Sequence, residues 1–127
     1  MSLEKILIAD DEIHIRRSLE FVLKKEGYEI VLAEFGEDAL AKAREHKPQL
    51  CFLDLQMPPM NGDEVCQAIK QDPDLEGTHV IILTARGQET DKQKIMESGV
   101  DEYMTKPFSP SKVIAKVQEI ADKLASS

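Results

Sequence analysis

The chain has 127 residues, 42% of them hydrophobic and 31% charged, which is a composition typical of one soluble globular domain. Its formal net charge of −8 at pH 7 argues against a surface for nucleic acid or for an anionic membrane, because both require a cluster of Lys and Arg. No apolar run approaches the ~20 residues that span a bilayer, so we expect a cytoplasmic protein.

Four short segments rich in Ile, Val, Leu and Phe recur along the chain, and each is too short to be a helix. They predict β-strands at residues 5–9, 29–33, 49–55 and 79–85, with a weaker fifth strand at 101–105.

The segments between these strands repeat their apolar side chains with the 3.6-residue period of an amphipathic helix. The helical faces carry Ile15, Leu19, Val22 and Leu23; Ala39, Leu40 and Ala43; Val65, Ala68 and Ile69; Ile95 and Met96; and Val113, Val117, Ile120 and Leu124. Gly27 and Gly99 are expected at helix C-termini. Ser109 and Pro110 are expected to begin the last helix.

Alternation of a strand with a helix five times predicts an α/β fold of three layers. The strands are apolar on both sides, so a parallel sheet would need helices on both faces. No repeat or linker divides the chain, and we expect a single domain over residues 1–127 with a frayed tail and no output domain. Cys51 and Cys66 lack a metal-ligand spacing and are expected to be buried free thiols in a reducing compartment.

Polar side chains follow the strands at the edge where an open parallel sheet binds its ligands. The first strand ends in Asp10 and Asp11, the third in Asp54, the fourth in Thr84, and the fifth runs into Lys106. Each has a purely structural alternative: the acids could cap a helix or lie in a loop, the threonine suits a strand, and the lysine would by default be exposed. These alternatives do not explain why all five residues close strands at one end.

Gathered carboxylates repel one another, so at least one keeps its proton unless a cation is bound. Mg²⁺ takes carboxylate, water and phosphate oxygens as ligands. A carboxylate can also attack phosphorus to form an aspartyl phosphate, a reaction that mainly requires neutralisation of the charge on the transferred oxygens. The Lys106 ammonium and the Thr84 hydroxyl could contribute to that neutralisation. The pattern therefore predicts phosphoryl chemistry that depends on a divalent cation.

Four motifs resemble the receiver domain of bacterial two-component response regulators, in an order that covers essentially the whole chain. They are ADDE at 9–12, FLDLQMPPMNG at 52–62, LTA at 83–85 and GVDEYMTKPF at 99–108. The resemblance implies a flavodoxin-like (CheY-like) fold, with a five-stranded parallel sheet of order 2-1-3-4-5.

The same resemblance implies a role for each site residue. Asp54 would be the phosphoacceptor, and with Asp11 it would bind Mg²⁺ directly, with Mn²⁺ as an alternative metal. Asp10 would act through water, and Gln56 would contribute its main-chain carbonyl. Lys106 would pair with the phosphoryl oxygens.

Two further features follow from the resemblance. The bond between Lys106 and Pro107 would be cis. Thr84 and Tyr103 would form a switch pair, in which the hydroxyl moves to a phosphoryl oxygen and the ring turns into the vacated space. The alternative for Tyr103 is a half-buried strand aromatic. The moving region would include the fourth strand, the loop at 86–90 and the fifth strand.

The resemblance implies a signalling switch and not a metabolic enzyme. It would take a phosphoryl group from a sensor histidine kinase or a phosphotransfer protein and act on a downstream protein, without direct contact to nucleic acid or membrane. The fourth helix, fifth strand and fifth helix would form the output face and could form a phosphorylation-dependent homodimer. Four charged residues there could pair across a dimer or remain solvated: Lys94, Asp101, Glu102 and Lys116.

Three alternatives belong to other classes. A phosphatase of the haloacid-dehalogenase type would need a second Asp where this chain has Gln56, and a cap over its substrate. A flavin domain would need a loop of hydroxyls and backbone donors where the acids stand, and the acids would repel the flavin phosphate. A receiver-like binding module without phosphorylation would have little use for the complete set of acids, Thr84 and Lys106.

Overall fold

The computed structural model describes residues 2–85 and 92–126. Within them the strands are β1 (Lys5–Ala9), β2 (Glu29–Ala33), β3 (Leu50–Asp54), β4 (His79–Ala85) and β5 (Glu102–Lys106). The helices are α1 (Ile13–Lys25), α2 (Gly36–His46), α3 (Gly62–Gln71), α4 (Lys92–Glu97) and α5 (Pro110–Ala125), with a short 3-10 turn η1 (Pro73–Leu75).

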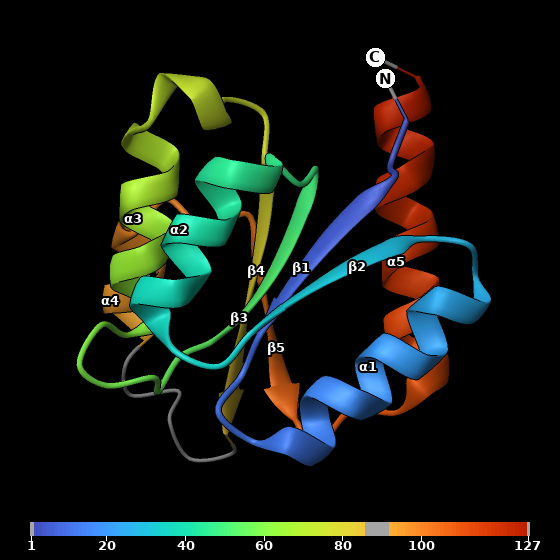
Figure 1. Cartoon of the computed structure of the whole chain (residues 1–127), viewed down its shortest axis with the longest axis horizontal. Helices are drawn as coiled ribbons and strands as arrows, with labels where there is room; N and C mark the ends of the chain where they lie inside the picture. The colour runs from blue at the N-terminus through green and yellow to red at the C-terminus, as the bar shows by residue number, and fades with distance from the viewer. Residues whose placement is uncertain (1, 86–91, 127) are drawn as a thin grey trace.

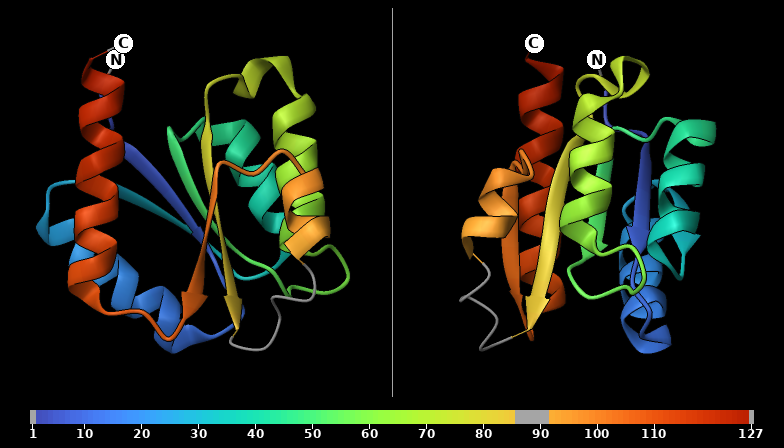
Figure 2. Two further views of the ribbon diagram at one scale, coloured as in Figure 1. Left: turned by 180° about the vertical axis from the view of Figure 1, so that it is seen from behind. Right: turned by 90° about the vertical axis from the view of Figure 1, so that its left-hand side faces the viewer.

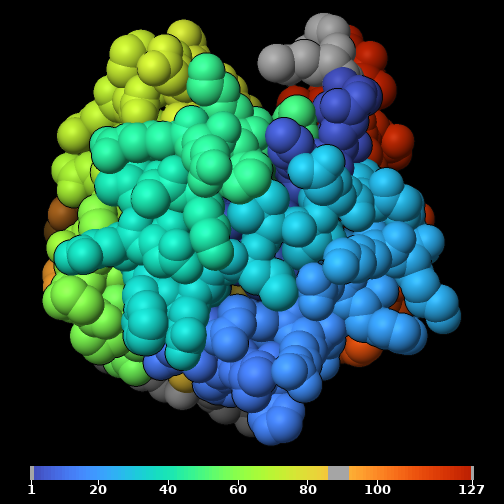
Figure 3. Space-filling view, viewed as in Figure 1, coloured from blue at the N-terminus to red at the C-terminus, as the bar shows by residue number. Residues whose placement is uncertain are grey.

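The strands form one parallel sheet in the order β2-β1-β3-β4-β5, as predicted (Figure 1). Helices α1 and α5 cover one face, and α2, α3 and α4 cover the other; Figure 2 shows the layers from two further directions. In the space-filling view, the edge strand β2 stays visible between α2 and α1 (Figure 3). The beginning of β1 and the end of α5 lie on the side of the molecule opposite the carboxyl ends of β4 and β5 (Figure 1).

The core consists of two apolar clusters separated by the sheet, because successive side chains of a strand point to opposite faces. In β3, Cys51 and Leu53 join the cluster under α2 and α3, whereas Leu50 and Phe52 join the cluster under α1 and α5. Both thiols are buried and free, as predicted, and burial raises their pKa values. Only the ends of the central strands can therefore carry polar groups to the surface.

The predicted element limits differ from the structure by one residue in two strands. β3 is shorter at both ends than the predicted 49–55, and β5 begins one residue later than 101–105. The helix ends agree: Gly27 and Gly99 have positive φ angles of 97° and 86°, and the Ser109 hydroxyl accepts from the backbone amide of Lys112 at 3.2 Å. Differences of one or two residues at the end of an element are usual.

The loop between β3 and α3 is closed by hydrogen bonds among its own residues. The Gly62 amide donates to the Leu55 carbonyl at 2.9 Å, and the Met57 amide donates to Asn61 Oδ1 at 3.0 Å. The first residue of α2, Gly36, backs this loop so closely that a Cβ there would overlap the Met60 carbonyl oxygen. The backbone of Gly62 approaches that of Asp54 in the same way. The position of the loop after Asp54 thus depends on two residues without side chains.

We expect Gly36→Ala to lower the free energy of unfolding by about 1–3 kcal/mol, the usual cost of overpacking, because the obstructing atom belongs to backbone. Urea unfolding followed by circular dichroism measures this. Glu37→Ala, at the exposed neighbouring position, should change stability by less than about 0.5 kcal/mol. Equal stability of the two variants would contradict the close approach of α2 to the loop.

Candidate functional site

The sheet register brings the predicted site residues together at one edge. Ala9 of β1 lies beside Leu53 of β3, so Asp10 follows at the level of Asp54. In β4 and β5, Thr84 lies beside Thr105, and the next residue of β5 is Lys106. The three central strands and β5 therefore deliver their polar ends to the same place, the lower edge in Figure 1.

Asp10 is fully buried, and its carboxylate is held at both oxygens. Oδ1 accepts from the backbone amide of Glu12 at 2.9 Å, and Oδ2 accepts from the Lys106 ammonium at 2.8 Å. The alternative in which an acid caps α1 is not what the structure shows, because the N-cap residue Glu12 makes no capping bond and Asp10 bonds Glu12 itself. The Asp10 carboxylate therefore holds both the turn after β1 and the Lys106 side chain in place.

Lys106 is the cation at the centre of the acids. Its Nζ lies 2.8 Å from Asp10, 3.5 Å from Asp54 and 3.9 Å from Glu12, and its side chain is only 13% exposed. It is therefore not the exposed lysine of the structural alternative. Burial alone would lower its pKa, but the hydrogen bond to Asp10 and the charges of Asp54, Asp10 and Glu12 outweigh burial and hold the pKa of Lys106 above its usual value.

Asp54 is the last residue of β3 and is 6% exposed, so it is not a loop acid. Burial is the first cause that raises its pKa, to about 7; the charge of Asp10 also raises it, and the charge of Lys106 acts in the opposite direction. The neighbouring carboxyl group of Asp11 further raises the pKa of Asp54 and favours a retained proton. Without a bound cation, the site therefore holds an acid that titrates near neutral pH.

In the described part of the chain, Asp10, Asp11 and Glu12 form an acidic group whose members each offer a carboxylate oxygen within 4.8 Å of the others. Glu12, the third acid of the motif ADDE, belongs to this group although no site role was predicted for it. Gln56 follows β3 by two residues, and its side chain is exposed. An all-oxygen donor set of carboxylates is the kind that suits Mg²⁺.

Thr84 carries the one buried side-chain oxygen that lacks a hydrogen-bond partner among the residues that the structure describes. Its side chain is 1% exposed. By strand alternation it faces the same side of the sheet as Ile82, whose neighbour in β5 is Tyr103. Tyr103 is half-buried and packs against the cluster on that side, which fits either reading of this residue. An orphaned buried hydroxyl beside the acids suits an acceptor that enters the site, such as a phosphoryl oxygen.

Several other predictions concern residues around this edge. The bond between Lys106 and Pro107 is cis, as expected, and so is the bond between Pro58 and Pro59, for which no cis bond was predicted. The loop at 86–90, expected to take part in the switch, lies outside the described residues.

Three of the four charged residues considered for a dimer already have partners within the chain. Asp101 pairs with Lys70 of α3 at 2.7 Å, and Glu102 pairs with Lys116 of α5 at 2.6 Å. Lys94 is exposed on α4. These ion pairs fasten β5 to the helices on both faces of the sheet.

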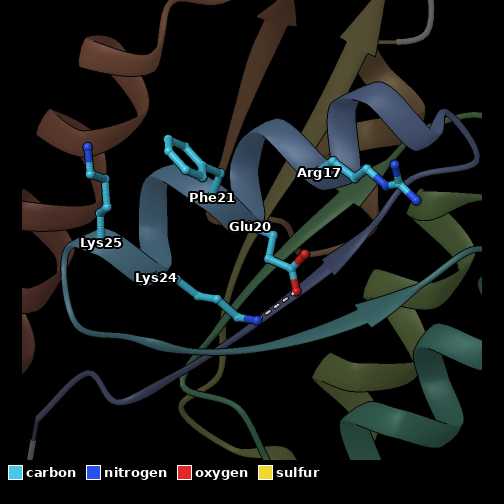
Figure 4. A pocket seen from close by; sticks show the side chains of 5 residues that line it. All are labelled: Arg17, Glu20, Phe21, Lys24 and Lys25. Carbon is cyan, nitrogen blue, oxygen red and sulfur yellow. Dashed lines mark ion pairs between the residues drawn. The ribbon is translucent and has the colours of Figure 1, made fainter.

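A separate pocket lies on the outer side of α1, away from the strand ends. Its lining comes from one helix and consists of Arg17, Glu20, Phe21, Lys24 and Lys25, with an ion pair between Lys24 and Glu20 at 3.1 Å (Figure 4). It contains none of the predicted site residues. In the ranges 2–85 and 92–126, none of the helices has both the length and the apolar character that a membrane crossing requires.

Comparison with known proteins connects this arrangement to one family. A family model described as the response regulator receiver domain matches residues 6–118. Alkaline phosphatase synthesis transcriptional regulatory protein PhoP of Bacillus subtilis is 43% identical over 117 residues, which cover 92% of this chain and 48% of that protein. Transcriptional regulatory protein ResD of the same organism is 43% identical over 116 residues, with coverages of 91% and 47%. The chain spans about half the length of these curated relatives.

Solved structures agree with the sequence relatives. Chemotaxis response regulator CheY4 of Vibrio cholerae matches with a TM-score of 0.86 and 30% identity, covering 94% of this chain and 99% of that one. The signal receiver domain of a signal transduction histidine kinase from Syntrophus aciditrophicus matches with a TM-score of 0.89 and 27% identity, covering 98% of this chain and 94% of that one.

The raised pKa of Asp54 predicts a characteristic pH dependence of stability when metal is removed with EDTA. Between its unfolded pKa near 4 and its folded pKa of about 7, the folded protein binds more protons than the unfolded chain, so stability falls as pH rises through this range. Asp54→Asn removes this loss. The variant should therefore be more stable than the wild type by an amount that grows from pH 4 to pH 7 and is constant above pH 7. The full difference should be about 1.4 kcal/mol for each unit by which the folded pKa of Asp54 exceeds its unfolded pKa.

Urea unfolding at several pH values checks this expectation. Asp74→Asn, an exposed acid in η1, serves as the control and should show no such trend. A gain for Asp54→Asn that is independent of pH would show that Asp54 titrates at its ordinary pKa.

Proposed function

The chain belongs to the response regulator receiver family, and from this premise we propose that it is a phosphoacceptor switch in which Asp54 takes a phosphoryl group from a phosphohistidine. The single observation that carries the proposal is the buried carboxyl of Asp54, 3.5 Å from the Lys106 ammonium and close enough to Asp10 and Asp11 for both acids to raise its pKa. A buried carboxyl next to a buried cation at an open edge of the sheet suits nucleophilic attack on phosphorus.

The residues that would hold Mg²⁺ are Asp11 and Asp54 directly, Asp10 through water and the main-chain carbonyl of Gln56, with Mn²⁺ as an alternative. When bound, the metal ion supplies positive charge that keeps the carboxylates ionised and neutralises charge on the phosphoryl oxygens. The group of carboxylates at residues 10–12 supports this assignment. The pKa of Asp54 agrees with it, because burial raises this pKa first and the charge of Asp10 raises it further.

The side chains of the chain divide the remaining work. An oxygen of Asp54 would form the new bond to phosphorus while the bond from phosphorus to the histidine nitrogen breaks, and the imidazole leaves with the electron pair. Lys106 would move its charge from the carboxylates toward the phosphoryl oxygens, for which its short contacts to Asp10 and Asp54 place it well. The Thr84 hydroxyl, which lacks a partner among the described residues, would donate to one of those oxygens.

The proposal makes the protein a signalling component that promotes only its own labelling and slow dephosphorylation. The donor would be a sensor histidine kinase or a phosphotransfer protein, and a rearrangement of the α4-β5-α5 face through Thr84 and Tyr103 would be read by a downstream protein or a second copy of the chain. Because Cys51 and Cys66 are free thiols, we place the protein in the cytoplasm. With a net charge of −8, the chain would not contact nucleic acid directly.

The wild-type protein should gain one phosphoryl group, measured by intact mass, when it is incubated with acetyl phosphate and Mg²⁺. Asp54→Asn should gain none, because the attacking oxygen is lost, and EDTA should abolish labelling of the wild type. Asp74→Asn should be labelled like the wild type. Label retained by Asp54→Asn would assign the phosphoacceptor to another residue.

Thr84→Val should stabilise the unphosphorylated protein by about 1 kcal/mol, because it removes a buried hydroxyl that has no partner among the described residues and keeps the shape. The same change should weaken the shift of the Tyr103 NMR signals on addition of beryllofluoride and Mg²⁺. Thr84→Ser keeps the hydroxyl and should preserve that shift. A less stable valine variant with a full Tyr103 response would rule out this role for the hydroxyl.

A further inference from the structure

The turn between β1 and α1 is held through every polar atom of one residue, Asp10. Its amide donates to the Ala33 carbonyl at 3.2 Å, and its two carboxylate oxygens accept from Glu12 and Lys106. Its main-chain carbonyl accepts from Nη1 of Arg16 at 2.6 Å. This last bond is the only one of the four that comes from a helix side chain.

The carbonyl of Asp10 and the amide of Asp11 belong to the same rigid peptide plane. A donor that fixes the carbonyl therefore also fixes the plane from which Asp11 extends. Asp11 is exposed, and its carboxylate lies within the acidic group of residues 10–12. The exposed acid in this short turn is thus linked, through one peptide plane, to the bond from the half-buried residue Arg16.

Helix stability does not explain why an arginine stands at this position. Arg16 is the fourth residue of α1, near the positive end of the helix dipole, where cations are disfavoured and acids are preferred. The first turn of α1 contains no acidic residue to pair with it. The guanidinium contacts a carbonyl, and among the described residues no ion pair joins it to a carboxylate, so the acid oxygens remain available to a metal ion.

We infer that Arg16 is a positioning residue for the divalent metal, because its bond to the Asp10 carbonyl orients the turn that presents Asp11. This inference rests on the metal site of the proposed function. A positioning role and a purely electrostatic role have opposite consequences. Loss of a cation beside acids should by itself strengthen metal binding, whereas loss of the orienting bond should weaken it.

The test compares Arg16→Gln with Arg17→Gln, which removes the same charge from the adjacent position of α1. Arg17 lines the pocket on the outer side of the helix (Figure 4). Isothermal titration calorimetry with Mg²⁺ alone, on protein shown to be folded by circular dichroism, gives the dissociation constants. We expect Arg16→Gln to weaken binding about 10-fold, as for other residues that orient metal ligands, and Arg17→Gln to leave it unchanged or slightly stronger.

Unchanged or stronger Mg²⁺ binding by Arg16→Gln would overturn the inference. If that variant does not fold, Arg16→Lys and Arg17→Lys replace the pair, because lysine keeps the charge but cannot reproduce the planar donor geometry. Binding weakened about threefold by Arg16→Lys alone would then support the inference, and equal constants would overturn it.

The outcome for the proposed function is read separately from the wild type. If the wild-type protein binds Mg²⁺ and is labelled on Asp54, but Arg16→Gln and Arg17→Gln bind Mg²⁺ equally well, only the role of Arg16 is ruled out. Wild-type protein that binds no Mg²⁺ defeats the metal site and this inference together.

Discussion

A buried ammonium group among carboxylates is the interaction on which the site depends. Lys106 is paired to the fully buried Asp10 and lies near Asp54 and Glu12, and without it these acids would face one another at an edge of low dielectric. One cation cannot neutralise them all, and the pKa of Asp54 is raised by burial first and then by the charge of Asp10. The site therefore keeps a surplus of negative charge, and a divalent cation is the simplest means of neutralising it. The same ion pair also joins β5 to the first strand across the breadth of the sheet.

The layered core explains why this charge collects where it does. Both faces of the central strands are buried under helices, so side chains that need water or a metal ion are tolerated only beyond the strand ends. The chain also removes side chains where the backbone must come close: Gly62 lies against Asp54, and Gly36 lies against Met60. Close packing under the loop then sets the direction of the groups that follow Asp54, and the metal site and phosphoryl chemistry proposed here would tolerate little displacement of those groups.

One part of the edge is built less firmly than the rest. Thr84 leaves its hydroxyl without a partner among the residues described, while Asp10 has all of its polar atoms bonded. A buried group that gains its bond only when a ligand arrives can favour a second arrangement of its strand. The neighbouring strand β5 is anchored at its beginning, away from the site, by the ion pairs of Asp101 with Lys70 and of Glu102 with Lys116. Movement would thus be concentrated near the site, while the far end of the strand remains anchored.

The sequence by itself determined the alternation of strands and helices and the sheet edge at which the acids meet, because hydrophobic periodicity and strand ends are local properties. The strand order and the role of each site residue were inferred from the resemblance of four motifs to a known family. Such motifs identify residues by their position in the sequence and give no distances between them. Only the tertiary structure showed that Lys106 is buried against Asp10, that Arg16 reaches the carbonyl behind the acids, and that Gly36 leaves room for Met60. These contacts join segments far apart in the chain or depend on the direction of one side chain, and neither periodicity nor composition encodes such a direction.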